Sequence, residues 1–227
     1  MLMKSRVRQR GAAIKKASVR EPQQKRSQRT REKILRAAER LFERRGYEEV
    51  TSHDIADAAG VAIGSFYAYF ADKEQLLLFL LQQRLDEEYH SAFESFQPED
   101  LFEPDPRPAL RRAVEAHFES KARHRWITRV LQLLAKKNRD VAAIDEHLFD
   151  RSQEHLLSLL TLASKAGLTY HLNIPIVSAL VVLTVDHIAT FCAEKSLEKQ
   201  KAEMIDTLVD MIFRTLFKEQ LPVGKRR

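Results

Sequence analysis

The sequence predicts an all-α protein of 227 residues, with a small N-terminal helical domain followed by a larger C-terminal one. Apolar residues recur at helical spacing over most of the chain, and no run alternates apolar and polar residues as a half-buried strand would. Six Gly and seven Pro are few for this length, so few breaks interrupt the helices. The third observation is the stretch from Thr51 to Lys73, which has the pattern of two short helices joined by a tight turn.

The first short helix of this stretch begins and ends at residues suited to those positions. Thr51 can accept a hydrogen bond at the N-cap, and Asp54 three residues later completes a capping box. Gly60 can adopt the left-handed conformation that ends a helix, and helical spacing resumes over residues 62–70. Two helices joined by such a turn form a helix-turn-helix, whose second helix enters the major groove of DNA.

The same stretch, IADAAGVAIGSFYAYFADKEQLL, resembles the signature of the TetR family of bacterial transcriptional regulators. The matching positions are Ile55-Ala56, Ala59-Gly60-Val61, Gly64, Tyr67, Phe70, Lys73-Glu74 and Leu76-Leu77. The resemblance covers residues 32–77; beyond them it rests on length and helical content. It implies a homodimer with a helix-turn-helix DNA-binding domain and a C-terminal ligand-binding and dimerisation domain. Such a protein binds a near-palindromic operator, in most cases as a repressor, and a small-molecule effector releases it.

Charge and helical spacing divide the chain into four segments. These are a flexible basic arm over 1–29, a helix-turn-helix domain over 30–75, an effector-binding and dimerisation domain over 76–221 and a basic tail over 222–227. Residues 1–31 hold eleven Lys or Arg against one acid, which suggests a polyanionic partner reached through this end. We expect the first helix to begin at Thr30 and to stop at Gly46.

Six further helices follow the helix-turn-helix. Asp72 can cap a fourth helix, which by the resemblance transmits the effector signal. Residues 97–108 contain four Pro and four acids, so we expect a loop there. The remaining predicted helices are Ala109–Ala122, Arg125–Lys137, Val141–Lys165, Pro175–Lys195 and Leu197–Phe217.

The last two predicted helices carry more apolar surface than one domain usually hides. The penultimate helix is apolar on nearly every side, which predicts that it is buried all round. This surface, together with the TetR resemblance, implies that both helices form a four-helix bundle with their copies in a second subunit; the alternative is an ordinary internal core. The expected interface residues are Leu180, Leu183, His187, Leu208, Ile212 and Phe213. The apolar run over 174–185 is too short to span a bilayer, so no membrane partner is expected.

The DNA contacts divide into phosphate contacts and base contacts. By resemblance, the phosphate contacts are Thr51, Ser52, Tyr67, Tyr69 and Lys73. The expected base-facing residues at the start of the recognition helix are Ala62, Ile63, Gly64 and Ser65. Many relatives carry Lys or Arg where Ile63 stands, and an Ile can make only apolar contacts with bases.

The candidate effector pocket combines aromatic residues with polar ones near helix ends. Its candidate residues are His117, Phe118, Trp126, Phe149, His155, Asp186, His187 and Phe191. Ordinary core packing is the competing interpretation for each aromatic residue. His147 and His155 share a helix face, but their spacing does not match the i, i+4 pattern of helical metal sites, so no metal and no cofactor is expected.

No phosphate loop, catalytic triad or paired-carboxylate motif is present in the sequence, so an enzyme is not expected. The single cysteine, Cys192, excludes an intramolecular disulfide and favours a cytoplasmic protein. The main hypothesis is a ligand-responsive DNA-binding regulator. The alternative is an architectural DNA-binding protein with weak sequence preference, which would use the basic arm.

Overall fold

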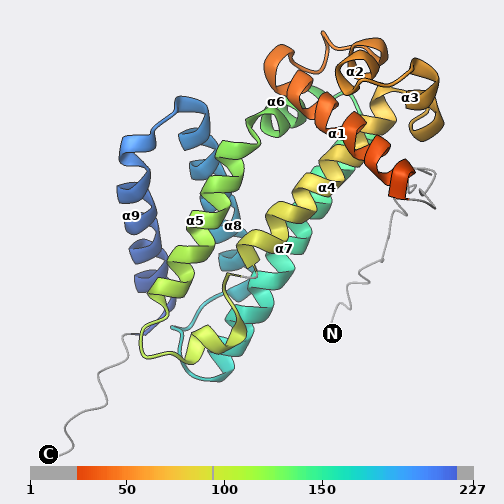
Figure 1. The fold of residues 1–227 in the computed structure, drawn as a ribbon. Helices are drawn as coiled ribbons and strands as arrows, with labels where there is room; N and C mark the ends of the chain where they lie inside the picture. Colours follow the sequence, from red (N-terminus) through yellow and green to blue (C-terminus); the bar gives the residue numbers. More distant parts are fainter. Residues whose placement is uncertain (1–24, 94, 219–227) are drawn as a thin grey trace, which may run out of the picture.

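The structure, a computed structural model, describes residues 25–93 and 95–218, and these residues form an all-α fold (Figure 1). The described residues contain no β-strand, only an isolated antiparallel bridge between Thr169 and Phe217. The helices are α1 Lys25–Arg45, α2 Ser52–Ala59, α3 Ile63–Tyr69, α4 Lys73–Phe93, the 3-10 helix η1 Pro98–Phe102, α5 Arg107–Arg123, α6 Arg125–Leu134, α7 Arg139–Lys165, α8 Ile174–Lys195 and α9 Glu198–Leu216. Most of the predicted basic arm and the whole of the C-terminal tail lie outside the described residues.

The first helix begins earlier than predicted. Helix α1 begins at Lys25, so the expected start at Thr30 was wrong and residues 25–29 are helical. No Pro or Gly interrupts these residues, and Ser27 is tied to α3 by a 2.8 Å hydrogen bond between its hydroxyl and that of Tyr69. Gly46 ends the helix as predicted, with a positive φ of 82°.

Helix α4 runs from the small domain into the larger one and lies alongside α7 (Figure 1). Its N-terminal half belongs to a buried core that also contains side chains of α1, α2, α3, α6 and α7. Trp126 and Ile127 of α6 belong to this core, with the Trp126 ring 5.8 Å from that of Phe42 in α1. The small domain is therefore packed directly onto α4 and α6 of the larger one.

The proline-rich segment before α5 is more ordered than a loop. Pro98 begins the 3-10 helix η1, and the Gln97 backbone N–H donates to Asp100 Oδ2 at 2.7 Å. Leu101 is buried in the second core, which includes side chains of α5, α7, α8 and α9. Proline is tolerated here because the first residues of a helix need no backbone donor.

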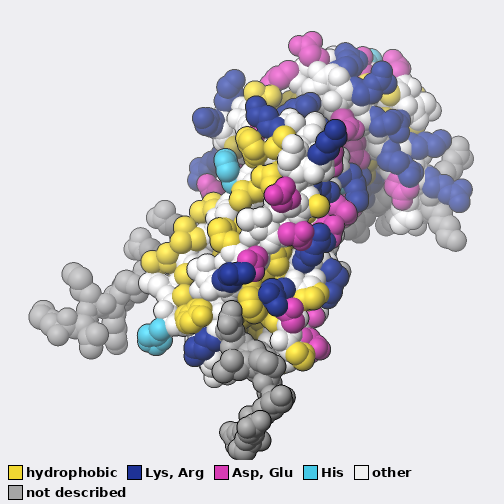
Figure 2. Space-filling view, turned by 90° about the vertical axis from the view of Figure 1, so that its left-hand side faces the viewer, with side chains coloured by type: hydrophobic (Ala, Val, Ile, Leu, Met, Phe, Trp, Pro, Cys, Tyr) yellow, Lys and Arg dark blue, Asp and Glu magenta, His cyan; other side chains and the backbone are white. Residues whose placement is uncertain are grey.

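Within a single chain, helix α8 is buried on one side only, so the chain by itself does not provide the burial all round that its composition predicts. Ile176, Leu180 and Leu183 are each more than half exposed, although the opposite side of α8 packs on α5 and α7. Hydrophobic side chains gather over the larger domain on the face shown in Figure 2, with Lys and Arg more frequent toward the small domain. Among the described helices, α8 alone has the length and composition of a membrane span, a test that helices of ordinary protein cores also pass.

Candidate DNA-binding face and effector cavity

The N-terminus of α2 carries the predicted capping box. The Asp54 backbone N–H donates to Thr51 Oγ1 at 3.1 Å, and the Thr51 backbone N–H donates to Asp54 Oδ2 at 2.8 Å. The Thr51 hydroxyl also donates to Asp54 Oδ2 at 2.7 Å. Both donors of Thr51 are thus used within the cap. The backbone N–H groups of Ser52 and His53, which follow it, have no acceptor in their own helix and can face a phosphate.

The Asp54 carboxylate is held in its charged form at this helix end. Hydrogen bonds from Thr51, followed by one from Arg45, lower its pKa to about 2. Arg45 Nη1 lies 3.2 Å from Asp54 Oδ1, so the guanidinium offsets a negative charge that would otherwise repel phosphate. Arg45 is a contributor to this face that the sequence analysis did not identify.

The turn between α2 and α3 has the predicted left-handed glycine. Gly60 has φ 65° and ψ 41°, and the Val61 backbone N–H donates to Ala56 O at 3.0 Å. These bonds satisfy the last carbonyls of α2 and redirect the chain into α3. Val61 and Ile63 are half-buried and pack on the core of the small domain. Ile63 is therefore a packing residue in part, and only its remaining surface is available to a base.

Helix α3 presents three of the predicted contact residues openly. Ala62, Gly64 and Tyr67 are exposed, while Ser65 is half-buried. The Tyr67 side chain, 52% exposed, stands edge-on to Phe66 at 5.3 Å between ring centroids. Phe66 is fully buried and anchors the helix, so the opposite face of α3 is directed outward.

Two predicted phosphate contacts already have partners within the chain. The Tyr69 hydroxyl bonds to Ser27 of α1. Lys73 Nζ donates to the Tyr47 backbone carbonyl at 2.9 Å and lies 4.1 Å from the centre of the Tyr47 ring. Burial lowers the pKa of Lys73 below its ordinary value. The carboxylates of Glu48 and Glu49 raise this pKa, but by less. These contacts position the turn after α1, and a phosphate contact by Lys73 would use its other N–H groups.

The larger domain contains a cavity of about 760 Å³, bounded by side chains of α4 to α9. Four of the eight predicted pocket residues line it, namely His117, Phe149, Asp186 and His187. Most of the lining is aliphatic or aromatic, supplied by residues such as Leu110, Leu148, Leu156 and Val181. A cavity of this size and character suits a small apolar molecule.

The other four predicted pocket residues do not line the cavity. Trp126 is buried in the core shared with the small domain, and Phe118 is buried in the second core. His155 packs its ring edge-on to Tyr89, and Phe191 is exposed on α8. The prediction was wrong for these residues: Trp126 and Phe118 fill a core, as aromatic side chains at helical spacing more often do, and Phe191 lies on the outer side of α8.

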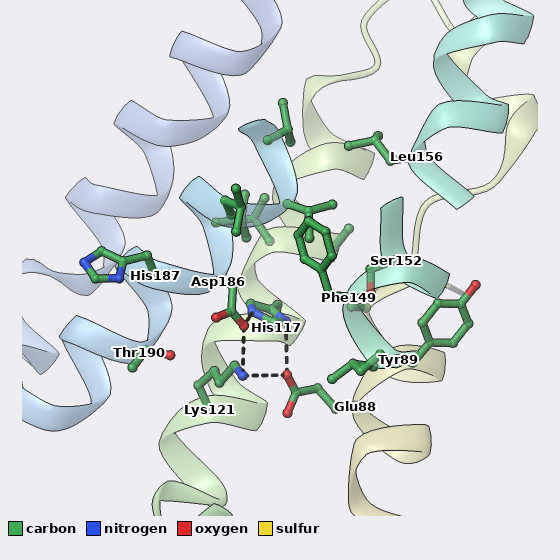
Figure 3. Close-up of a pocket in the computed structure, with 18 of the residues that line it drawn as sticks. Glu88, Tyr89, His117, Lys121, Phe149, Ser152, Leu156, Asp186, His187 and Thr190 are labelled. Atoms are coloured by element: carbon green, nitrogen blue, oxygen red, sulfur yellow. Dashed lines mark ion pairs between the residues drawn. The ribbon is translucent and has the colours of Figure 1, made fainter. Parts of the chain in front are cut away.

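A cluster of four charged or titratable side chains lies at one wall of the cavity (Figure 3). Lys121 Nζ is 3.3 Å from Glu88 Oε1 and 2.8 Å from Asp186 Oδ1. His117 lies between the same two carboxylates, with Nδ1 3.5 Å from Glu88 Oε1 and Nε2 3.4 Å from Asp186 Oδ1. Helices α4, α5 and α8 thus meet through a polar cluster in mostly apolar surroundings.

The side chains of this cluster stabilise one another in their charged forms. Burial alone would lower the pKa of Lys121, but Glu88 and Asp186 raise it well above its ordinary value. Burial raises the pKa of Asp186, while His117 and Lys121 lower it further, to well below its ordinary range. The ammonium and the Asp186 carboxylate are therefore both charged at neutral pH.

Glu88 and Lys121 were not identified from the sequence, although a signal was available. Glu88 follows Leu81 and Leu85 at helical spacing, and Lys121 follows Val114 and Phe118 in the same way. A charged residue on an apolar face is either paired or functional, because burying an unpaired charge is costly.

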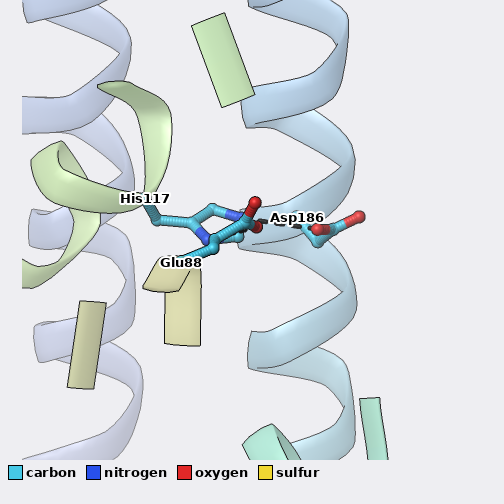
Figure 4. Close-up of side chains that lie close together, drawn as sticks. All are labelled: Glu88, His117 and Asp186. Carbon is cyan, nitrogen blue, oxygen red and sulfur yellow. Dashed lines mark ion pairs between the residues drawn. The ribbon is translucent and has the colours of Figure 1, made fainter. Parts of the chain in front are cut away.

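Glu88, His117 and Asp186 place one ligand atom each within 4.8 Å of the others, as a metal site would (Figure 4). Lys121 Nζ, however, already contacts the carboxylate oxygens of Glu88 and Asp186. A divalent cation would have to take these same oxygens from the ammonium to complete its coordination, so the cluster does not fit a metal.

A second ion-pair cluster connects the larger domain to the small one. Arg84 of α4 donates two hydrogen bonds to Glu39 of α1, from Nε to Oε1 at 2.8 Å and from Nη2 to Oε2 at 2.7 Å. His124 Nδ1, at the junction of α5 and α6, is 3.5 Å from Glu39 Oε1. Lys121 lies one helical turn before His124, so α5 reaches both clusters.

The expected dimer face is supported only on α8. Leu180, Leu183 and His187 are exposed. Leu208, Ile212 and Phe213 are buried in the protomer's own core, so their assignment to an intersubunit contact was wrong. The apolar stripe of α9 faces inward because α9 packs on α5 and α8.

Comparison with known proteins connects the small domain to one family. Residues 34–80 match the family model described as bacterial regulatory proteins, tetR family. The chain is 36% identical over 94 residues to the transcriptional regulator EthR of Mycolicibacterium smegmatis, covering 40% of this chain and 41% of the relative. It is 37% identical over 108 residues to TtgR of Pseudomonas putida, covering 46% and 50%. The matches thus span half or less of these curated relatives.

The fold agrees over nearly the whole chain. The structure of FadR from Bacillus subtilis in complex with stearoyl-CoA superposes with a TM-score of 0.63 at 21% identity, covering 80% of this chain and 96% of that one. At this identity the likeness shows the fold. The chain thus carries a small domain, over residues 34–80, that matches the tetR family of bacterial regulatory proteins, joined to an all-helical larger domain.

Proposed function

We propose that the protein is a ligand-responsive transcriptional regulator of the cytoplasm and not an enzyme. It binds a near-palindromic operator as a homodimer, in the manner of a repressor, and a small molecule in the cavity releases it. One observation carries the proposal: α3 exposes Gly64 and Tyr67, and its N-cap residue Ala62 is exposed beside them, within the residues that match the tetR family. An exposed second helix anchored by a buried Phe66 is the arrangement of a DNA recognition helix.

Phosphate contacts from α2 would fix the orientation of α3 in the groove. The backbone N–H groups of Ser52 and His53 lie at a helix N-terminus, where a phosphate is attracted. Tyr67 adds a hydroxyl donor on the neighbouring helix. Base selection would rest on Ser65, on the surface of Ala62 and Gly64, and on the shape of the DNA.

The exposed face of α8 supports a homodimer. Leu180 and Leu183 lie one turn apart on α8 and are both more than half exposed, so a second copy of this helix could cover them. Two copies of α3 would then enter successive major grooves about 34 Å apart.

The cavity supports an effector. The relative from Bacillus subtilis is described in complex with stearoyl-CoA, a ligand with a long apolar chain. In this chain, α4 lines the cavity through Glu88 and Tyr89 and contacts α1 through Arg84. A ligand that moves α4 would therefore also move the small domain.

The experiment is fluorescence anisotropy of the purified protein on DNA from upstream of its gene and on scrambled DNA of equal length. We expect binding to upstream DNA to be tighter by about a hundredfold or more, the lower range for a specific site. Tyr67→Ala should weaken binding to both sequences and leave the salt dependence nearly unchanged, because tyrosine is uncharged. Tyr170→Ala, which removes an exposed tyrosine of the larger domain, is the matched control.

Equal binding to the two DNAs, with both affinities collapsing at higher salt, would contradict the proposal. Sequence-independent phosphate contacts would then account for all binding, as in an architectural protein.

A further inference from the structure

We propose that the cavity recognises a lipophilic organic cation, with its positive group beside Glu88 and Asp186 and its apolar body along the aliphatic wall. This inference rests on the proposed function and names the chemical class of the effector. It follows from the charge of the cavity, from the state of Glu88 and from the position of Lys121.

The cavity lining is negatively charged. Its acidic residues are Glu88, Asp145, Glu146, Asp150 and Asp186, and its lysines are Lys121 and Lys136. Apart from histidines, no other ionisable cation of the described residues lines it. Low-dielectric walls strengthen such an imbalance, so a positive ligand is favoured and a negative one is opposed.

The Glu88 carboxylate contributes to this excess of negative charge, and its contacts with the rest of the chain are long. It is 5% exposed, and its Oε1 atom has no hydrogen-bond partner among the described residues, although it lies 3.3 Å from the Lys121 ammonium. Its other oxygen has a long contact of 3.4 Å with the Ser120 hydroxyl. A buried carboxylate this weakly satisfied is costly, and a bound cation would lower that cost.

Lys121 cannot balance both carboxylates and also recognise an anion. Its one positive charge is shared between Glu88 and Asp186, so these three residues together carry one net negative charge, and the His117 ring is the only other polar partner that the cluster supplies to both carboxylates. A carboxylate ligand would be a third anion around one ammonium. A cation instead finds Asp186, whose side chain is 47% exposed, on the cavity side of the cluster.

The remaining walls suit the body of such a ligand. Phe149 lines the same cavity as His117, and in the view of Figure 3 its ring is drawn above the ion pairs. An aromatic face can attract an organic cation by a cation–π contact. The volume of about 760 Å³ lies within the range of sites that hold drug-sized molecules.

The test uses three probes with the same ten-carbon chain, all below their micellar concentrations: decyltrimethylammonium, decanoate and decanol. Binding to the full-length protein is measured by isothermal titration calorimetry. We expect the cation to bind at least about tenfold more tightly than the anion or the alcohol, because one charge at close range in a cavity is worth more than a tenfold change. Decanol reports the apolar contribution alone.

Glu88→Gln and Asp186→Asn should each weaken binding of the cation by about fivefold or more, and should leave decanol binding within about twofold. Glu154→Gln, which removes an exposed carboxylate of α7 outside the cavity, is the matched control and should change nothing. Two separate carboxylates are tested because Asp186 is half-exposed and tolerates substitution even if Glu88 does not.

Decanoate binding as tightly as the cation, or a cation affinity that both variants leave unchanged, would overturn the inference. Operator binding is measured on the same preparations by anisotropy. Intact operator binding without preference for the cation would refute only the ligand class. Absent operator binding with a clear preference for the cation would refute the regulator and retain the charge selectivity.

Discussion

Replacing Glu39 with Gln tests the connection between the two domains. Glu39 of α1 accepts two hydrogen bonds from Arg84 of α4, and both side chains are less than one fifth exposed. The change preserves the size of the side chain and removes its charge. Arg84 would keep one carboxylate partner, Glu87, whose Oε2 lies 2.6 Å from its Nη1.

The magnitude follows from the pKa of Glu39. Burial raises this pKa, but His124 and Arg84 lower it further, to about 2 from an ordinary 4.5. The full shift corresponds to about 3 kcal/mol of stability at neutral pH, which we reduce to about 2 kcal/mol because the site is partly hydrated. Since the folded pKa is depressed, this contribution is complete above pH 4.5 and is lost as the pH falls through about 2.

The assay is urea unfolding of the wild type, Glu39→Gln, Arg84→Gln and the double variant. We expect a coupling energy between Glu39 and Arg84 of about 1 kcal/mol at pH 7, because His124 lowers the Glu39 pKa as well as Arg84, and we expect it to fall by about half or more at pH 3. The matched control is the exposed pair of Glu32 and Arg36, also on α1, for which we expect about 0.3 kcal/mol.

A coupling energy no larger than that of the control pair would show that the bidentate pair of Glu39 and Arg84 adds no more stability than an exposed ion pair, and would contradict this prediction. A coupling energy that is unchanged between pH 7 and pH 3 would refute the assignment to the Glu39 carboxylate.

The remaining predictions concern the turn, the phosphate contact and the dimer. Gly60→Ala should lower the free energy of unfolding by about 1 kcal/mol because of its positive φ, whereas Gly64→Ala, in the helix, should not lower it. Lys73→Gln should lower the slope of log affinity against log salt by about 0.9 for each subunit bound, and an unchanged slope with a lower melting temperature would assign its ammonium to the intramolecular contact alone. Leu180→Glu should convert a dimer to a monomer in sedimentation velocity, whereas Leu133→Glu, at another exposed leucine, should not; a monomeric wild type would contradict the dimer.

The helix-turn-helix could be predicted because its signals are local. The Thr51 cap, the Asp54 carboxylate and Gly60 act over a few residues, and each occupies its expected role. The sequence does not predict that the Thr51 hydroxyl donates its hydrogen bond within its own cap, because that bond depends on the side-chain rotamer of Thr51. The inward position of Ile63 likewise depends on the packing of the small domain as a whole.

The cavity was predictable only in part because its cluster joins three helices. His117 and Asp186 were identified as polar residues near apolar ones, and both lie at the cavity wall. The ion pairs of Glu88 and Lys121 could not be recognised from the sequence, because they form only where α4, α5 and α8 pack together. Trp126 illustrates the opposite error, since its size and position suggested a pocket while it fills the core beneath α1.

Helix α8 shows what its hydrophobic pattern cannot predict. Its composition predicts burial on every side but does not say what covers each side. Within one protomer, Leu180 and Leu183 remain exposed, while the stripe of α9 is used internally. A dimer through α8 would bury the exposed side of this helix. Its apolar surface would then come mainly from α8, and not equally from α8 and α9.

The most direct test of the central claim is selection of DNA by the purified protein from sheared fragments of its own genome, followed by sequencing. The account predicts enrichment of a small number of fragments that share a near-palindromic site, with half-sites separated by about one helical turn of DNA or a multiple of it. Recovery that depends only on fragment length and falls uniformly with salt would contradict a sequence-specific dimeric regulator.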